Sequence, residues 1–205
     1  NIHSKTALKM LQVANIPIIE IMDLQHSKPV AQAVGFDNRL ASFQMVEAMI
    51  KQEKRNIVYF AARMDNRTLQ KIQGYEAVMK KHGLQPYKLI TEQPSSFSLG
   101  AQQLRQILAQ RPDTDGIFCT NDDLAIGAVF ECQRQGIKIP QQIAIAGFHG
   151  HNVGQSMTPQ LASVVTPRFE IGKIAAQEII DRLNHIPQAQ EFIDTGFKLH
   201  FGETL

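Results

Sequence analysis

The sequence predicts an α/β fold built from doubly wound parallel sheets with helices on both faces. The first observation is a regular alternation, along the 205 residues, of short β-branched runs with amphipathic helical segments. Strands that alternate with helices in this way pair in parallel, because each helix returns the chain across a face of the sheet. The second observation is that the sequence has no fixed-period repeat and no low-complexity segment.

The first quarter of the chain predicts a helix at residues 4–14, strands at 16–22 and 33–36, and a helix at 38–52. Ser4 is placed to cap the first helix, which ends before Pro17. The strand that follows is rich in isoleucine and closes at Asp23. The helix after the second strand carries one apolar stripe, formed by Leu40, Phe43, Val46 and Ile50.

The remaining strands are predicted at residues 57–61, 87–90, 116–119, 143–148 and 163–165, with one or two more between 192 and 201. The remaining helices are predicted at 66–83, 98–110, 122–135 and 168–184. In each helix the apolar residues recur at three- and four-residue spacing. Gly83 and Gly136 are typical of helix C-termini, and Pro167 is typical of a helix start.

Composition and charge exclude several classes of protein. With 43% hydrophobic and 20% charged residues, and no apolar run of membrane-span length, we expect a soluble protein with no membrane partner. The net charge of +2 gives little support for direct nucleic-acid binding by this segment. Cys119 and Cys132 lack metal or redox spacing and lie in apolar stretches, which predicts buried free thiols in a reducing, cytoplasmic compartment.

Ligands of doubly wound sheets bind at the carboxyl ends of strands, so the residues after each strand are the candidates. Asn121 has two interpretations: it caps the next helix, or its amide contacts a sugar hydroxyl. Ser95 belongs either to a helix-capping loop or to a hydroxyl-rich pocket wall. His149 and His151 lack a third metal ligand, so they are either turn residues facing solvent or, for His149, a ligand contact.

Cationic residues stand at two of these strand ends. Arg168 pairs either with a surface carboxylate or, through its planar fork, with a carboxylate ligand. Arg67 and Lys71 occupy the first turns of a helix, where a solvated face is the commoner arrangement. The sequence has no nucleophile elbow, phosphate loop or dinucleotide motif, so we expect no enzyme, no cofactor and no metal. A binding role is favoured.

Several segments occur together in the order and spacing of one family. They include TNDDLAIGA at residues 120–128, IPQQIAIAGF at 139–148, PQLASV at 159–164, and the segments at 33–38, 55–60 and 71–75. Together they resemble the effector-binding core of the LacI/GalR family of transcriptional repressors. Residues 16–23 and 148–151 are most similar to the gluconate-operon repressor subgroup of that family.

The resemblance implies two doubly wound parallel-sheet subdomains of periplasmic-binding-protein-like type, with effector in the cleft between them. It assigns residues 1–53 and 166–188 to an N-subdomain that is incomplete in this chain. Residues 54–165 and the terminal strands at 189–205 form the C-subdomain. The family's DNA-binding headpiece has no counterpart here, and the family forms a homodimer that binds operator DNA through that headpiece.

The family's effector-binding positions carry over residue by residue. Lys71 stands where the family has an arginine, Asn121 matches, His149 replaces an aspartate, and Ser95 replaces an aromatic platform. A pocket that has a cation but lacks both the aspartate and a stacking surface favours an acyclic sugar acid such as gluconate. The full set of candidate effector-binding residues is Arg67, Lys71, Ser95, Asn121, His149, Thr166 and Arg168.

The expected function is that of a repressor domain that binds a small sugar acid, with gluconate as the leading candidate, and thereby lowers operator affinity. The alternative is a periplasmic sugar-binding protein of the same fold. A sugar-processing enzyme is disfavoured, because no base and nucleophile pair is evident.

Overall fold

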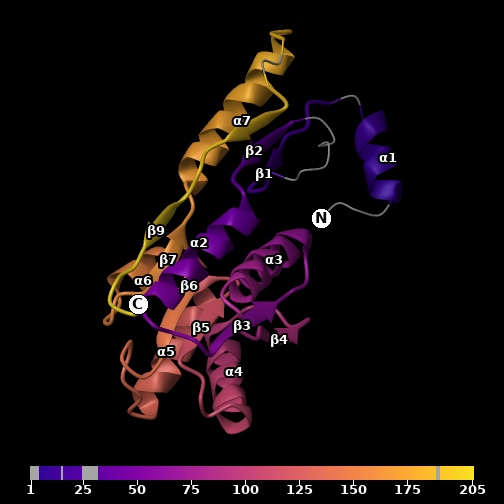
Figure 1. The fold of residues 1–205 in the computed structure, drawn as a ribbon. Coiled ribbons are helices and arrows are strands. Elements are labelled where there is room, and N and C mark those ends of the chain that lie inside the picture. Colours follow the sequence, from indigo (N-terminus) through magenta and orange to yellow (C-terminus); the bar gives the residue numbers. More distant parts are fainter. Residues whose placement is uncertain (1–4, 15, 25–31, 188–189) are drawn as a thin grey trace. The chain divides into compact units, whose positions relative to one another are not determined.

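The computed structural model describes residues 5–14, 16–24, 32–187 and 190–205, and it confirms the predicted α/β fold (Figure 1). Its helices are α1 (Lys5–Val13), α2 (Asn38–Lys51), α3 (Asn66–Lys81), α4 (Phe97–Gln110), α5 (Asp122–Arg134), α6 (Asn152–Ser156) and α7 (Arg168–Leu183). Its strands are β1 (Glu20–Ile21), β2 (Ala33–Gly35), β3 (Ile57–Ala62), β4 (Tyr87–Thr91), β5 (Gly116–Cys119), β6 (Ala144–His149), β7 (Ala162–Val165), β8 (Phe192–Asp194) and β9 (Lys198–His200).

The chain divides into two units, the first within residues 1–38 and 167–197 and the second within 39–166 and 198–205. This division differs from the boundaries predicted at residues 53, 165 and 188. Almost all of α2 belongs to the second unit, because α3 packs on its backbone: a Cβ on Gly74 would lie 2.1 Å from the Arg39 carbonyl oxygen. Strand β8 belongs to the first unit, because it pairs with β2.

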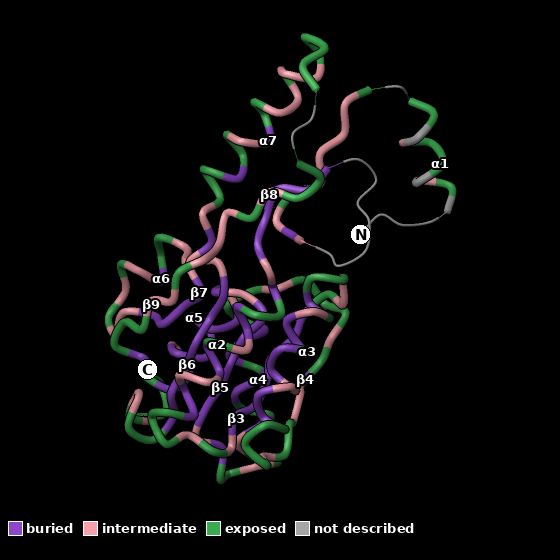
Figure 2. Tube along the Cα trace, turned by 45° about the horizontal axis from the view of Figure 1, so that its top comes forward, coloured by how far each residue is buried: buried purple, intermediate pink, exposed green. Residues whose placement is uncertain are grey.

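The second unit is built on a six-stranded sheet in the order β4-β3-β5-β6-β7-β9. Neighbouring strands pair in parallel, except that β9 runs antiparallel to β7. Successive residues of β3 face opposite helical layers. Val58 and Phe60 pack with residues of α4 and α5, whereas the Tyr59 ring lies 5.4 Å from that of Tyr75 on α3. The central strands β3 and β5 are therefore buried on both faces and are purple in Figure 2.

The first unit contains a parallel sheet in the order β1-β2-β8, with α7 packed against β1 and β2. Strand β1 is shorter than the predicted 16–22. Only Glu20 and Ile21 pair with β2, and Met22 then leaves the strand with a φ of 68°. The predicted cap at Ser4 lies outside the described residues.

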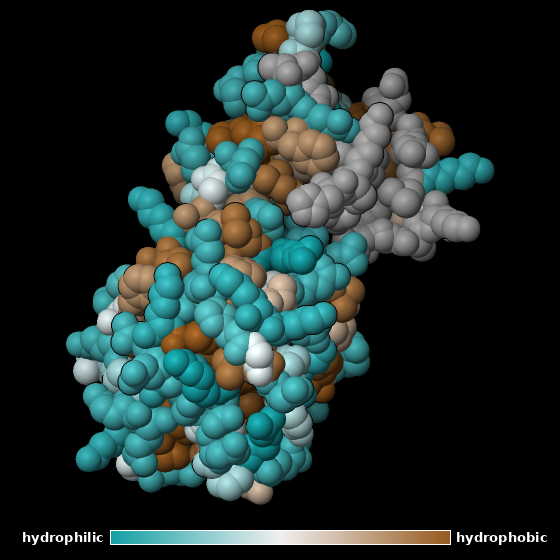
Figure 3. Space-filling view, in the orientation of Figure 1, coloured by the Kyte–Doolittle hydropathy of each residue, from teal (hydrophilic) through white to brown (hydrophobic). Residues whose placement is uncertain are grey.

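The buried thiols and the hydrophilic surface agree with the expectations drawn from composition. Cys119 and Cys132 are buried free thiols, as predicted, and burial raises the pKa of Cys119 and raises that of Cys132 to about 12. Hydrophilic side chains cover most of the face of the second unit seen in Figure 3, with smaller apolar patches between them. Among the described residues, no helix is both long and apolar enough to cross a membrane.

Helices α4 and α5 touch backbone to backbone through a reciprocal pair of glycines. A Cβ on Gly100 of α4 would lie 2.1 Å from the Leu124 carbonyl oxygen of α5. A Cβ on Gly127 of α5 would lie 2.0 Å from the Phe97 carbonyl oxygen of α4. Only glycine allows this approach, and the contact fixes the position of the α5 N-terminus relative to α4.

We expect Gly127→Ala to lower the free energy of unfolding by about 1–3 kcal/mol, because the two helices must separate to admit the methyl group. The matched control is Gly172→Ala on α7, where a Cβ meets nothing within 4 Å. That change should raise stability by roughly 0.5–1 kcal/mol through helix propensity. Urea denaturation followed by circular dichroism measures both, and a Gly127→Ala variant as stable as the control would contradict the close contact.

Candidate functional site

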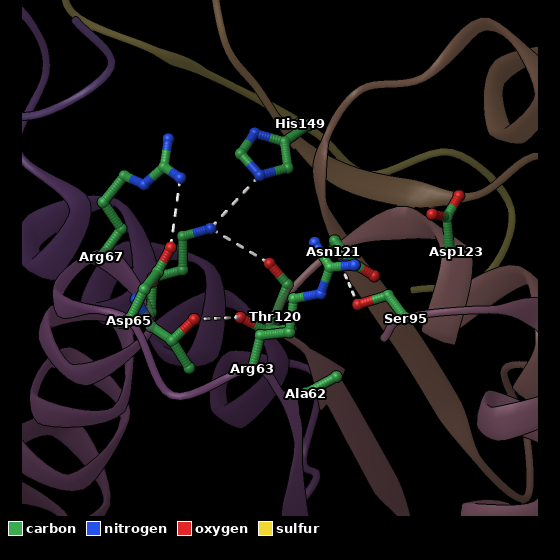
Figure 4. Close-up of a pocket in the computed structure, with 11 residues that line it drawn as sticks. Ala62, Arg63, Asp65, Arg67, Ser95, Thr120, Asn121, Asp123 and His149 are labelled. Atoms are coloured by element: carbon green, nitrogen blue, oxygen red, sulfur yellow. Dashed lines mark hydrogen bonds and ion pairs between the residues drawn. The ribbon is translucent and has the colours of Figure 1, made fainter. Parts of the chain in front are cut away.

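A polar pocket of about 400 Å³ opens at the carboxyl ends of the strands of the second unit (Figure 4). Its walls come from the end of β3 and the first turns of α3, from the loops after β4 and β5, and from the end of β6. The lining residues are Ala62, Arg63, Asp65, Arg67, Thr68, Lys71, Ser95, Thr120, Asn121, Asp123 and His149. Parallel strands deliver all these residues to one edge of the sheet, which is where the strand-end rule places ligands. Every described lining residue belongs to the second unit.

Lys71 supplies a buried positive charge to this pocket. Its side chain, on the second turn of α3, is only 4% exposed. The Nζ atom donates to the Thr120 carbonyl oxygen at 3.1 Å and lies 3.3 Å from His149 Nε2. It also lies 3.8 Å from the centroid of the Phe148 ring, a cation–π distance. The ammonium is thus held between the ends of β5 and β6, and it donates to His149 Nε2 when that ring is neutral and Nδ1 carries the proton.

Asn121 caps α5, as one of its two interpretations predicts, and it also lines the pocket. Its Oδ1 accepts from the Leu124 backbone N–H at 3.2 Å and caps α5. Its Nδ2 donates to the Ser95 hydroxyl at 2.6 Å in the pocket wall. Ser96, rather than Ser95, caps α4 by accepting from the Leu99 N–H. Ser95 is therefore left to line the pocket.

A buried carboxylate, Asp122, holds the loop that carries His149. Its Oδ1 accepts from the Ser163 hydroxyl at 2.7 Å, and its Oδ2 accepts from the His151 backbone N–H at 2.5 Å. The Ser163 oxygen in turn accepts from the Gly150 N–H at 3.0 Å. A Cβ on Gly147 would lie 2.3 Å from Asp122 Oδ1, so glycine is needed there. His149 itself has a φ of 103°, a left-handed backbone that this network maintains.

The first turn of α3 forms the remaining wall. Asp65 caps the helix by accepting from the Thr68 N–H at 2.8 Å, and its other oxygen pairs with Arg67 at 3.1 Å. Burial acts to raise the pKa of Asp65, but the Thr68 N–H and the Arg67 charge outweigh it and hold that pKa below its ordinary value. The Thr68 and Thr120 hydroxyls lie 3.4 Å apart. The wall thus offers hydroxyl groups beside an ion pair.

The structure brings five of the seven candidate residues to the pocket: Arg67, Lys71, Ser95, Asn121 and His149. Thr166 does not line it, but its hydroxyl donates to the His149 carbonyl oxygen at 3.4 Å. Arg168 begins α7 in the first unit and is not among the lining residues.

Sequence reasoning did not select several pocket residues, among them Arg63, Asp65 and Thr120. Their position directly after β3 and β5 is the signal that could have identified them. Within the described part of the chain, no three His, Cys, Asp or Glu side chains are grouped as metal ligands. The His149 and His151 rings instead stack, with centroids 6.0 Å apart.

Comparison with known proteins finds one matching domain family and several transcriptional regulators that are similar in sequence. The model of the periplasmic binding protein-like domain family matches residues 46–205. The HTH-type transcriptional regulator GntR of Escherichia coli K12 is 48% identical over 203 residues, 99% of this chain and 61% of that protein. The regulator IdnR of the same organism is 42% identical over 204 residues, again 99% and 61%. The chain therefore spans about three fifths of the length of these curated relatives.

A solved structure of a transcription regulator is also similar to this chain. The crystal structure of the transcription regulator GntR from Chromobacterium violaceum superposes on the whole chain with a TM-score of 0.95. It is 32% identical in sequence, and the match covers 75% of that protein chain.

We expect Asp122→Asn to lower the free energy of unfolding by about 1.5–3 kcal/mol, because the amide cannot accept both hydrogen bonds that the carboxylate receives. Asp123→Asn is the matched control. Asp123 is the next residue and 40% of its side chain is exposed, so its loss should cost no more than the helix-dipole contribution of roughly 0.3–1 kcal/mol. Thermal unfolding compares the two variants, and equal stability would show that the buried carboxylate does not hold the loop.

Proposed function

The chain belongs to the LacI family of transcriptional regulators, with the periplasmic-binding-protein-like fold, and we propose that it is the effector-binding part of a repressor whose effector is a small sugar acid. The observation that carries the proposal is the pocket itself. It combines a buried cation, Lys71, with hydroxyl and amide groups at the carboxyl ends of three strands. These groups match a ligand that carries both hydroxyls and a negative charge.

The lining of the pocket favours an open-chain ligand over a ring. Apart from the imidazole of His149, no aromatic side chain is among the described lining residues. A pyranose or a purine gains much of its affinity by stacking on an aromatic face, and this surface is missing where Ser95 stands. An acyclic chain of hydroxyls needs no such face. Gluconate, six carbons long with one carboxylate, is the ligand we propose.

The contact between Lys71 and His149 favours an acid over a neutral sugar. His149 stands at a position where the resemblance implies an aspartate in the family. An aspartate there would repel a carboxylate ligand and would pair with Lys71. The imidazole brings no negative charge to the position next to the ammonium, which favours an anionic ligand there over one that an aspartate would accept. Of the other candidates, Arg67, Ser95 and Asn121 line the same pocket, whereas Thr166 and Arg168 stay proposed effector residues on the resemblance.

The proposal for the full-length protein is allosteric repression. A homodimer binds operator DNA through a headpiece outside this chain, and gluconate lowers that affinity by a coupling free energy of about 1–3 kcal/mol. This chain has a net charge of +2, which supports a role in binding effector rather than DNA. The relatives described above are regulators, which disfavours the alternative of a periplasmic sugar-binding protein.

The first test concerns His149. We expect His149→Asp to weaken gluconate binding by at least about tenfold, because the new carboxylate neutralises Lys71 and repels the ligand. Binding of the neutral polyol glucitol, which has the same carbon chain, should be unchanged or stronger. His149→Gln, which is polar but uncharged, is the control and should affect both ligands alike. Calorimetric titration measures all of these, and equal losses of acid and polyol in His149→Asp would refute an acidic effector.

The second test concerns DNA. We expect the full-length protein to retard operator DNA in a gel-shift assay, and gluconate to raise the protein concentration needed by roughly 5- to 150-fold. Residues 1–205 alone should not retard the same DNA specifically. An unchanged shift in the presence of saturating gluconate would refute the regulatory role while leaving the binding site intact.

A further inference from the structure

The pocket contains three cations, and the protein already engages two of them. Arg67 forms an ion pair with Asp65 at 3.1 Å. Lys71 is buried and donates to the Thr120 carbonyl oxygen. The third, Arg63, is exposed and lines the same pocket (Figure 4). Its guanidinium forms no hydrogen bond or ion pair with any residue that the structure describes.

The backbone holds Arg63 in a specific conformation. Its φ is 52°, in the left-handed region that disfavours every residue except glycine. The N–H of Arg63 donates to the Thr91 carbonyl oxygen at 3.0 Å, and its carbonyl oxygen accepts from the Asp65 N–H at 2.8 Å. The turn is thus tied to β4 on one side and to the α3 cap on the other. A disfavoured conformation that is fixed in this way, at the end of a strand and at a pocket, is typical of a functional site.

We propose that Arg63 is the residue that selects for an acid, by binding the carboxylate of the effector through its planar fork. This inference rests on the proposed function and adds the residue that distinguishes an acid from a neutral sugar. Arginine presents two parallel N–H groups that match the two carboxylate oxygens, which Lys71 cannot do with a single nitrogen. Arg67 has the same fork, but its Nη2 atom already donates to Asp65 Oδ2 at 3.1 Å.

The arrangement assigns different parts of the ligand to different walls. Arg63 lies after β3 and takes the carboxylate. Asn121 and Ser95 present amide and hydroxyl groups after β5 and β4, and these take the hydroxyls of the chain. Lys71 adds positive charge from the base of the pocket, where it is nearly inaccessible to solvent. An open-chain sugar acid that is charged at one end satisfies these groups together.

The experiment compares Arg63→Gln with Arg67→Gln in the full chain, with gluconate and glucitol as probes in calorimetric titrations. Both variants remove one positive charge from the same pocket, and glutamine preserves an unbranched polar side chain. We expect Arg63→Gln to weaken gluconate binding by about 10- to 100-fold, the range for a hydrogen-bonded charged group. It should leave glucitol binding within about threefold of wild type. Arg67→Gln should weaken gluconate binding by less than about fivefold, as for an exposed ion pair.

Arg63→Lys separates fork geometry from charge. It keeps the positive charge and loses the second N–H group, so its gluconate affinity should lie between those of the wild type and Arg63→Gln. Thermal unfolding of each variant verifies that the turn is still folded. Equal losses in Arg63→Gln and Arg67→Gln would overturn the proposal, because the pocket would then respond to net charge alone.

The same titrations distinguish this inference from the function on which it rests. If the wild type binds gluconate and Arg63→Gln binds it equally well, the role of Arg63 is refuted and the sugar-acid effector stands. If the wild type binds no gluconate, the proposed effector is refuted and the role of Arg63 with it.

Discussion

The candidate site depends on one buried carboxylate. Asp122 accepts hydrogen bonds from Ser163 on β7 and from the backbone of the loop after β6, and so joins the first turn of α5 to two strands. A negative charge without solvent is costly unless such donors surround it. The same network holds His149 in its left-handed conformation beside Lys71. The glycine contact between α4 and α5 fixes the helix from which the carboxylate projects.

The fold was predictable because its signal is repeated many times along the chain. Each strand–helix unit carries the same apolar patterns, and most boundaries in the structure lie within one or two residues of those expected. What was not predictable depends on distant pairing. Strand β1 pairs with β2 only at Glu20 and Ile21 and ends where Met22 turns away, and α2 joins the second unit because Gly74 packs on its backbone. No local pattern records these contacts.

The site shows the same limit. Lys71, Ser95, Asn121 and His149 could be selected because they follow predicted strands or match family positions. Asp122 was not selected, since the partners of its carboxylate are 29 and 41 residues away in sequence. Arg63 was not selected either, because the left-handed turn that places it cannot be read from neighbouring residues. The strand-end rule predicts which loops line a pocket. The charge balance inside the pocket can be determined only from the three-dimensional structure.

The buried ammonium of Lys71 also affects the entropy of binding. A free lysine side chain loses roughly 1.5–2 kcal/mol of rotamer freedom when it becomes fixed. Here the carbonyl of Thr120, the imidazole of His149 and the ring of Phe148 already fix it. That cost is therefore met during folding, and a ligand that approaches Lys71 meets a preorganised charge. A charge held this rigidly would not shift to follow a ligand of a different length, so under the proposed function it would contribute to selection by length as well as by charge.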